Sequence, residues 1–461
     1  MKKLMFLTLA LLIGAGAVAQ KFPNLAKTPP MGWNSWNKYH CDVSETLIMQ
    51  MADAMVSSGM KDAGYEYIVI DDCWQVSRDE NGEIVPDKER FPHGMKYVAD
   101  YVHSKGLKFG IYSSAGTVTC QRRPGGFGHE YQDARTYARY GVDYLKYDWC
   151  GSTTQDARSS YTNMRNALFA AGRPIVFSIC EWGQSKPWEW AGDVGHLWRT
   201  TGDISDNWNS MLGIFRQQRD LARYAGPGRW NDPDMLEVGN GGMTTEEYRT
   251  HFSLWCMLAS PLMAGNDLAN MSADTKAILM NKEMIAIDQD TLGRQATIYR
   301  DNGDYQIWVK GLANNEKAVC LLNTSDEKKS VLVDFALLAS IRTGGFRGFG
   351  GPGGVPGTPG APGAAGAPGM PGAAGAQGAA SRPATQGAAA AGAASRPAGQ
   401  AAGATPAGAG QQGPRTMPQA LTVNDYRIRD IWAHTDLTLK ETSIYVDMPP
   451  HSVKVYRFIR K

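Results

Sequence analysis

Residues 142–148 read Val-Asp-Tyr-Leu-Lys-Tyr-Asp, a short run of β-branched, aliphatic and aromatic side chains that ends in charged residues. Such a run is typical of a buried strand. Seven similar runs occur between residues 28 and 290, and they alternate with amphipathic stretches, which is the pattern of repeated βα units. A closed parallel barrel requires eight strands. The sequence therefore predicts an α/β fold, a (β/α)8 TIM barrel over 20–291, with strands at 31–33, 65–70, 108–112, 142–148, 174–179, 196–199, 228–230 and 257–262.

One amphipathic stretch, 43–58, illustrates the helices expected between these strands. Its apolar residues Leu47, Met51, Ala54 and Met55 fall on one face at helical spacing. Asp42 precedes the stretch and has the side chain of a helix cap. The spacing predicts a helix that covers the outside of the barrel.

Beyond Thr291 the pattern changes to short alternating strands with no long helices between them. An Asn302-Gly303 pair marks a tight hairpin turn. The chain is therefore expected to continue as a small antiparallel β-sandwich domain over 292–342 and 418–461, with strands at 296–299, 305–309, 318–322, 331–335, 426–432, 443–448 and 452–459.

A tract of Gly, Ala, Pro, Gln, Ser and Thr at 343–417 interrupts the predicted sandwich. Glycine recurs at every third position from Gly345 to Gly378, which is the collagen period. A triple helix is the lesser interpretation, because the tract is short and its two ends must rejoin one domain. The composition favours a disordered linker, which buries no core and carries no chemistry.

The N-terminus resembles an export signal. Lys2 and Lys3 precede an apolar run, and Ala17-Val18-Ala19 provides the small residues of a cleavage site. Residues 1–19 are therefore expected to be a signal peptide of an exported protein, periplasmic or extracellular, with no membrane span. Lys and Arg total 47 against 45 Asp and Glu, a balance without the basic excess typical of a nucleic-acid partner.

Polar and aromatic residues gather where the predicted barrel strands end. In such barrels the active site is built at the carboxyl ends of the strands. A single acidic residue after a strand is more often a helix cap or a loop carboxylate, so the joint placement carries the interpretation. It predicts one acidic, aromatic-lined pocket suited to a sugar, with contributions from Trp36, Asp71, Asp72, Tyr112, Lys146, Asp148, Glu181, Trp182, Arg199, Asp203, Asp232 and Asp234.

Lys146 and Asp148 are two residues apart on a predicted strand and therefore point to the same face. An adjacent ammonium favours the ionised form of a carboxylate, which is the form that a nucleophile needs. The same pair could also be a structural ion pair at a strand end, an alternative that the pair alone leaves open.

The cysteines fit the predicted barrel. Cys41 and Cys73 follow the first and second strands, and Cys120 and Cys150 follow the third and fourth. Each pair lies on the same rim of adjacent βα units, which favours disulfides Cys41–Cys73 and Cys120–Cys150, although sequence does not fix connectivity. Cys180, Cys256 and Cys320 are then expected to be buried thiols. No Cys/His spacing suggests a metal site.

Several motifs resemble the α-galactosidases (melibiases) of glycoside hydrolase family 27. They are PMGWNSW at 30–36, IDDCW at 70–74, YLKYDWC at 144–150, CEWG at 180–183, WNDPDML at 230–236 and, in the sandwich, RDIW at 429–432. The resemblance extends over the chain except for the signal and the insert. Some family members have a cysteine partner for Cys180 where this chain has Gly195, so that bridge is not expected.

This resemblance implies a retaining exo-glycosidase that removes terminal α-D-galactosyl residues through a covalent galactosyl-enzyme. The family's nucleophile falls on Asp148 and its acid/base on Asp203, which must hold a proton to donate to the leaving oxygen. It implies no metal and no cofactor. Sugar contacts fall on Trp36, Asp71, Asp72, Tyr112, Lys146, Glu181, Trp182, Arg199 and Asp234.

Two related sugars remain alternatives. Glu181 offers an acceptor to a free 2-hydroxyl and occupies the space of an acetamide, which favours galactose over N-acetylgalactosamine. β-L-Arabinopyranose lacks only the hydroxymethyl group. The family role of Asp71 and Asp72 favours galactose, but the discrimination is a matter of a few hydrogen bonds, so activity on both sugars stays open. A non-catalytic, secreted carbohydrate-binding scaffold is a third alternative, disfavoured because both predicted catalytic carboxylates are present. The natural leaving group, the oligomeric state and the role of the insert are not readable from the sequence.

Overall fold

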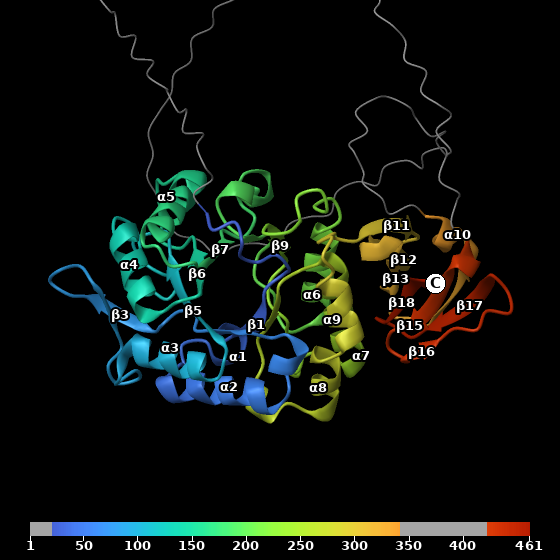
Figure 1. Ribbon diagram of the computed structural model, residues 1–461, viewed down its shortest axis with the longest axis horizontal. Helices are drawn as coiled ribbons and strands as arrows, with labels where there is room; N and C mark the ends of the chain where they lie inside the picture. Colours follow the sequence, from blue (N-terminus) through green and yellow to red (C-terminus); the bar gives the residue numbers. More distant parts are fainter. Residues whose placement is uncertain (1–20, 342–421) are drawn as a thin grey trace, which may run out of the picture. The chain divides into compact units, whose positions relative to one another are not determined.

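The computed structural model describes residues 21–341 and 422–461, so the predicted signal peptide (1–19) and insert (343–417) lie outside the described residues. Eight strands form one parallel sheet in the order β10-β1-β2-β5-β6-β7-β8-β9 (Figure 1). The sheet ends are joined after β9, where Leu236 forms a parallel bridge with Ala264 and closes the barrel. The strands are β1 Met31–Asn34, β2 Tyr67–Val69, β5 Lys108–Ser114, β6 Tyr144–Asp148, β7 Val176–Cys180, β8 Leu197–Arg199, β9 Trp230–Asp232 and β10 Leu262–Ala264.

Helices cover the outside of the barrel. They pack there because every second residue of a strand points outward and is apolar. In β6, Leu145 and Tyr147 belong to the core between strands and helices. Tyr144 packs instead inside the barrel with Val176 and Leu197. Lys146 and Asp148 follow Tyr144 at intervals of two and share its inward face. The helices are α1 Trp36–Tyr39, α2 Glu45–Ser57, α3 Gly94–Ser104, α4 Glu130–Tyr140, α5 Ala157–Ala170, α6 Trp208–Gln217, α7 Thr245–Leu258, α8 Ala273–Leu279 and α9 Lys282–Asp288.

The prediction of the eighth strand at 257–262 is wrong for most of its length. Met257 and Leu258 complete α7, and the strand β10 begins only at Leu262. Every residue of α7 from Thr250 onward is buried, since the helix packs on the barrel and on sandwich strands β13 and β18. A helix buried all round has no polar face to reveal its period, so its apolar end resembled a buried strand.

The helix predicted at 43–58 is α2, but its cap is not Asp42. Ser44 is the N-cap residue, and its hydroxyl accepts the backbone N–H of Leu47. A short hairpin of β3 Gln75–Arg78 and β4 Ile84–Pro86 follows β2 and was not predicted.

The sandwich consists of a six-stranded antiparallel sheet, ordered β11-β12-β13-β18-β15-β16, and a two-stranded sheet of β14 and β17. A core that includes Val319, Leu321, Val333 and Phe458 lies between them. One short helix, α10 Phe335–Ser340, and strand β16 Thr435–Asp436 were not predicted. The remaining strands are β11 Thr297–Asp301, β12 Tyr305–Gly311, β13 Lys317–Asn323, β14 Lys329–Asp334, β15 Tyr426–Asp430, β17 Ser443–Met448 and β18 Val453–Arg460.

Within the described ranges, none of the helices has the length and apolarity that crossing a membrane demands. Both predicted disulfides are present, Cys41–Cys73 and Cys120–Cys150. Cys180, Cys256 and Cys320 are buried free thiols, as expected.

Candidate active site

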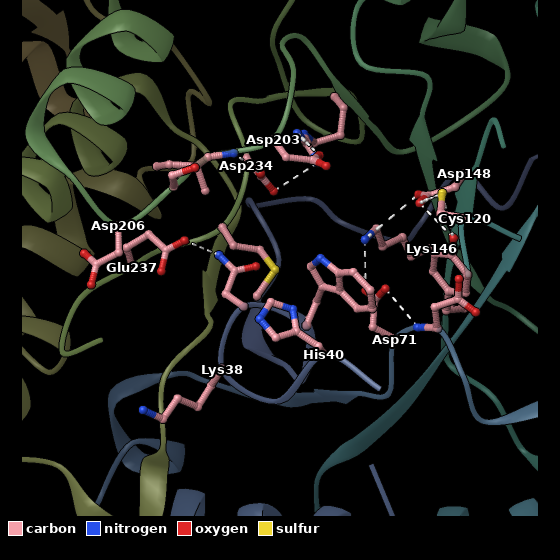
Figure 2. A pocket seen from close by; sticks show the side chains of 18 of the residues that line it. Lys38, His40, Asp71, Cys120, Lys146, Asp148, Asp203, Asp206, Asp234 and Glu237 are labelled. Atoms are coloured by element: carbon pink, nitrogen blue, oxygen red, sulfur yellow. Dashed lines mark hydrogen bonds and ion pairs between the residues drawn. The ribbon is translucent and has the colours of Figure 1, made fainter. Parts of the chain in front are cut away.

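A cavity of about 440 Å³ opens at the carboxyl ends of the barrel strands (Figure 2). Because parallel strands all end on the same rim, side chains that are far apart in sequence meet there. Most of the residues singled out in the sequence line this cavity. They are Trp36, Asp71, Asp72, Tyr112, Lys146, Asp148, Trp182, Arg199, Asp203 and Asp234.

Asp148, the last residue of β6, is buried at one end of the cavity. Its Oδ2 accepts a hydrogen bond from the hydroxyl of Tyr112 at 2.9 Å, and its Oδ1 lies 4.0 Å from Nζ of Lys146. Burial raises the pKa of Asp148 to about 6; Lys146 opposes this shift and Asp71 adds to it. Lys146 thus acts in the predicted direction, but desolvation is the larger effect. The carboxylate form still predominates at neutral pH.

Lys146 is held by a second carboxylate. Its ammonium donates to Oδ2 of Asp71 at 2.9 Å, and the same oxygen accepts Nδ2 of Asn34 at 2.7 Å. A charge-assisted bond between nearly buried groups fixes the position of Lys146 between Asp71 and Asp148. These contacts of Lys146 and Asp71 connect the ends of β1, β2 and β6.

Asp72 is oriented by its own set of donors. Its Oδ1 accepts the hydroxyl of Thr119 at 2.9 Å, and its Oδ2 accepts the backbone N–H of Gln121 at 2.9 Å. Burial nevertheless raises its pKa above the ordinary value. Asp72 is therefore a preoriented acceptor at the wall of the cavity, next to Asp71.

Arg199 joins two carboxylates on the opposite wall. Its Nη2 donates to Oδ1 of Asp203 at 2.9 Å, and its Nη1 lies 3.0 Å from Oδ1 of Asp234. The guanidinium is buried, whereas the side chain of Asp203 is 65 % exposed. Desolvation raises the pKa of Asp203, but the charges of Arg199 and Lys146 outweigh it and bring the pKa below its ordinary value. The lowered pKa favours the carboxylate form of Asp203 in the free protein, and its role as the proton-bearing acid stays a prediction.

Asp232, at the end of β9, was predicted to contribute to the pocket but does not line the cavity. Neither does Glu181, a predicted sugar contact. It is buried, and its Oε2 accepts the backbone N–H of Ser185 at 2.6 Å. Its neighbour Trp182 adopts a left-handed backbone conformation, with φ of 57°, and lines the cavity instead. A direct role of Glu181 at a 2-hydroxyl stays a prediction.

Sequence reasoning missed the far end of the cavity, which includes Lys38, His40, Asp206, Glu237 and Asn240. Burial raises the pKa of Glu237 to about 7. Lys38 lies in the four-residue helix α1 and the other four side chains lie in loops or turns beyond the strand ends, where no periodic signal marks them. The only available signal was their sequence proximity to Trp36, Asp203 and Asp234.

Within residues 21–341 and 422–461, His, Cys, Asp and Glu form no group of three or more arranged to hold a metal ion. The carboxylates of the cavity accept hydrogen bonds from ammonium, guanidinium, hydroxyl and backbone N–H groups. This arrangement offers a polar, preoriented surface for a hydroxyl-rich ligand, with two carboxylates, Asp148 and Asp203, in different charge environments.

Comparison with known proteins agrees with this site. Residues 28–290 match the family model described as alpha galactosidase A, and residues 302–347 and 411–458 match the alpha galactosidase C-terminal beta sandwich domain. Alpha-galactosidase A of Cellvibrio japonicus is 58% identical over 338 residues, covering 71% of this chain and 83% of the relative. An alpha-galactosidase of Cyamopsis tetragonoloba is 52% identical over 314 residues, covering 68% and 76%.

A solved structure supports the same assignment. Alpha-galactosidase I from Mortierella vinacea superposes with a TM-score of 0.76 at 33% identity, covering 95% of this chain and 98% of that one. The match extends over both the barrel and the sandwich. From the family models, the identities and this superposition, the chain belongs to the alpha-galactosidase family.

Proposed function

We propose that this protein hydrolyses terminal α-D-galactosides with net retention of configuration, with Asp148 as nucleophile and Asp203 as general acid/base. The observation that carries the proposal is the pair of carboxylates that line one cavity from β6 and from the loop after β8. Retaining glycosidases need two such groups about 5 to 5.5 Å apart, one to attack and one to transfer a proton.

In the first step, an oxygen of Asp148 attacks the anomeric carbon and the bond from that carbon to the leaving oxygen breaks. The leaving oxygen takes a proton from Asp203, so a covalent galactosyl ester on Asp148 and a neutral alcohol result. In the second step Asp203 takes a proton from water, whose oxygen attacks the same carbon and frees Asp148. Two inversions give an α-galactose product.

The protonation of Asp203 has to be compatible with its contact to Arg199. A sugar in the cavity removes water from around Asp203, and desolvation disfavours the charged form of a carboxylate. Substrate binding therefore raises the pKa of Asp203 from its lowered value in the free protein. Tyr112 and Lys146 meanwhile stabilise the Asp148 carboxylate that attacks.

Galactose is supported as the sugar by the relatives at 50–58% identity over about two thirds of the chain, which are named alpha-galactosidases. A yeast alpha-galactosidase with 25% identity has been solved with raffinose. For the β-L-arabinopyranosidase and putative α-N-acetylgalactosaminidase structures, at 21–23% identity, the likeness shows the fold alone. Asp71, Asp72 and Lys146 provide acceptors and a donor for the ring hydroxyls.

Aryl glycosides test the proposal directly. The purified protein is assayed with aryl α-D-galactoside, aryl β-L-arabinopyranoside and aryl α-N-acetylgalactosaminide. NMR then identifies which anomer of the sugar is released first. We expect the galactoside to be cleaved fastest, with α-galactose released first. Absence of cleavage of all three would reject the enzyme assignment, and β-galactose as first product would reject retention.

We also propose that the protein is exported and that residues 1–19 are removed. Support comes from the signal-like N-terminus and from two disulfides, which persist in oxidising compartments. The intact mass of protein recovered from the periplasm or the medium tests this, with Gln20 as the expected first residue. Recovery only of the full-length chain from the cytosol would contradict it.

A further inference from the structure

A turn of the sandwich between β17 and β18 reaches the barrel through the side chain of His451. Helices α6, α7 and α9 lie on the side of the barrel that faces the sandwich (Figure 1). Nδ1 of His451 is 2.8 Å from Oε1 of Glu247, at the start of α7. The imidazole ring stacks on the indole of Trp208, the first residue of α6, with 4.2 Å between the ring centroids. One side chain of the sandwich therefore touches the beginnings of two barrel helices.

These two helices restrain the loop that carries Asp203. The loop follows β8 and ends at Trp208, where α6 begins. From the side of α7, the hydroxyl of Tyr248 donates to Oδ2 of Asp206 at 2.8 Å, and the backbone N–H of Gly242 donates to the same oxygen at 2.5 Å. A Cβ on Gly242 would collide with the carbonyl oxygen of Asp206, so the two segments pack backbone against backbone. The loop is thus held at the same two helix starts that His451 touches.

Glu247 links the sandwich to the start of α7. Its Oε2 accepts the backbone N–H of Thr244 at 2.8 Å and completes the capping box of the helix. Its Oε1 faces Nδ1 of His451, and because an ionised carboxylate only accepts, the imidazole donates here. The next residue along α7 is Tyr248, which holds Asp206. His451 therefore fixes the carboxylate that begins α7, and with it the place of Tyr248.

The turn that presents His451 is itself firmly held. His451 has a φ of 55°, a left-handed conformation that persists where the surroundings impose it. Its carbonyl accepts the hydroxyl of Thr250 at 2.8 Å, and its Nε2 is 2.9 Å from Oδ1 of Asp326. Within the sandwich, Nδ2 of Asn323 donates to the carbonyl of Pro449 at 2.8 Å. The ring therefore approaches both helices from a fixed position.

We propose that His451 is a positioning residue for the acid/base loop, so that the sandwich takes part in catalysis. This inference rests on the proposed function, in which Asp203 gives a proton to the leaving oxygen. The side chain of Asp203 is mostly exposed, so its position depends on the backbone of its loop. A general acid must lie within hydrogen-bond reach of the atom that it protonates. A displacement of about 1 Å can lower a rate about 100-fold.

The sandwich offers a matched control in His434. This residue also has a left-handed backbone, with φ of 54°, and its Nδ1 is 2.6 Å from Oε1 of Glu283 in the first turn of α9. None of the residues of α9, all of which the structure describes, lines the active-site cavity. Glycine adopts a positive φ without strain. His451→Gly and His434→Gly therefore each remove one imidazole and one contact to a barrel glutamate, with the backbone conformation retained.

Two leaving groups separate the position of the acid from a general loss of stability. Phenyl α-galactoside needs a proton on its leaving oxygen, whereas 2,4-dinitrophenyl α-galactoside releases a stable anion without one. The measured quantity is kcat/KM, which reports the step that breaks this bond. In His451→Gly we expect kcat/KM for the phenyl substrate to fall about tenfold further than for the dinitrophenyl substrate. In His434→Gly the ratio of the two values should equal that of the wild type.

Two more variants complete the comparison. His451→Asn places an amide nitrogen where Nδ1 stands, so it should recover part of the lost ratio. Trp208→Leu removes the stacked ring from the barrel side, and it should lower the ratio even if His451→Gly does not fold. Thermal unfolding of each variant reports the stability that is lost with the contact.

Asp203→Ala is the reference for complete loss of the acid. If it lowers the ratio while His451→Gly, or Trp208→Leu in its place, leaves the ratio unchanged, the positioning role is overturned. An equal fall in His434→Gly also overturns it, because loosening of the sandwich would then explain the effect. An unchanged ratio in Asp203→Ala, or wild-type protein that cleaves neither galactoside, overturns the proposed function and this inference with it.

Discussion

The carboxylate of Asp232 accepts a hydrogen bond from the backbone N–H of Asp234 at 2.9 Å, and Asp234 has a φ of 93°. A residue with a Cβ rarely adopts this left-handed conformation, which costs about 1–3 kcal/mol when the surroundings impose it. A second restraint comes from α7, where Nε1 of Trp255 donates to the carbonyl of Asp234 at 2.7 Å. Asp234 is thus fixed through both its N–H and its C=O.

This strained backbone orients the loop that carries Asp203. It lets one oxygen of Asp234 reach Arg199 at 3.0 Å and the other accept the N–H of Ile204 at 2.8 Å, next to Asp203. We expect Asp232→Ala to lower kcat about 10- to 100-fold with a smaller change in KM, since Asp203 is displaced. Asp232→Asn keeps the acceptor oxygen and should recover most of kcat.

Steady-state kinetics with an aryl α-galactoside, with thermal unfolding as a check on folding, measure this effect. Trp255→Phe removes the N–H donor together with the five-membered ring of a buried indole. It should show the same split between kcat and KM, and thermal unfolding reports the separate loss of packing. Wild-type kcat in Asp232→Ala would contradict the positioning role. An Asn variant as slow as the Ala variant would assign the effect to the charge of Asp232 instead of its hydrogen bond.

Activity lost on removal of Asp148, the proposed nucleophile, should be rescued by a small anion. Asp148→Ala is expected to lower kcat at least about 10³-fold, because the covalent intermediate can no longer form. Azide fits the space left by the carboxylate and attacks from the same face, so the product is β-galactosyl azide, of inverted configuration. Kinetics with and without azide, and NMR of the product, measure both effects. Asp100→Ala, on the exposed face of α3, is the matched control, and wild-type kcat in Asp148→Ala would eliminate the assignment.

The barrel was largely readable from the sequence because its strands are buried on both sides. Runs such as 174–179 are apolar almost throughout and are followed by polar residues at the active-site rim. Where this contrast is missing, prediction failed. Thr250 to Leu258 is buried on every side of α7, so its helical period is invisible in the sequence. Ser44 and Asp42 are both good caps, and only the structure shows which one meets Leu47 N–H.

The near half of the site was predictable for the same reason, since Asp71, Lys146, Asp148 and Arg199 stand at or next to strand ends. Glu237 and Asn240 lie in a loop whose path depends on contacts with Asn37 and Tyr248. The pKa values of the carboxylates were even harder to predict from the sequence. Adjacency to Lys146 indicated an ionised Asp148, but the pKa of about 6 reflects burial, which sequence does not reveal.

Removal of most of the insert should leave catalysis intact. The buried ammonium of Lys317 donates to the carbonyls of Ala339 at 2.8 Å and Ile341 at 2.5 Å, and it lies 5.3 Å from the ring centroid of Tyr426. The last described residues before the insert and the first strand after it are therefore both anchored at Lys317. We expect a chain with a short Gly/Ser bridge in place of 344–413 to keep kcat and KM for an aryl α-galactoside within about twofold. A large fall in kcat/KM would show that the insert serves the active site.

The pH dependence of kcat/KM should report the unequal proton affinities of the two carboxylates. In the proposed mechanism the reactive form has Asp148 ionised and Asp203 protonated. In the free enzyme the pKa of Asp203 is lowered and that of Asp148 is raised to about 6. Between these two pKa values the pair holds one proton, and a constant minor fraction of it resides on Asp203. Above about pH 6 the proton is lost, so kcat/KM should fall about tenfold per pH unit.

Rates measured from about pH 4 to about pH 9 test this profile. Lys146 lowers the pKa of Asp148, so its removal in Lys146→Met should move the alkaline limb to higher pH, even though that variant also binds substrate less well. The alkaline limb of the kcat profile should lie at higher pH than that of the kcat/KM profile, because bound sugar desolvates Asp203 and raises its pKa. A kcat/KM that stays level or rises from about pH 6 to about pH 8 would mean that another group supplies the proton.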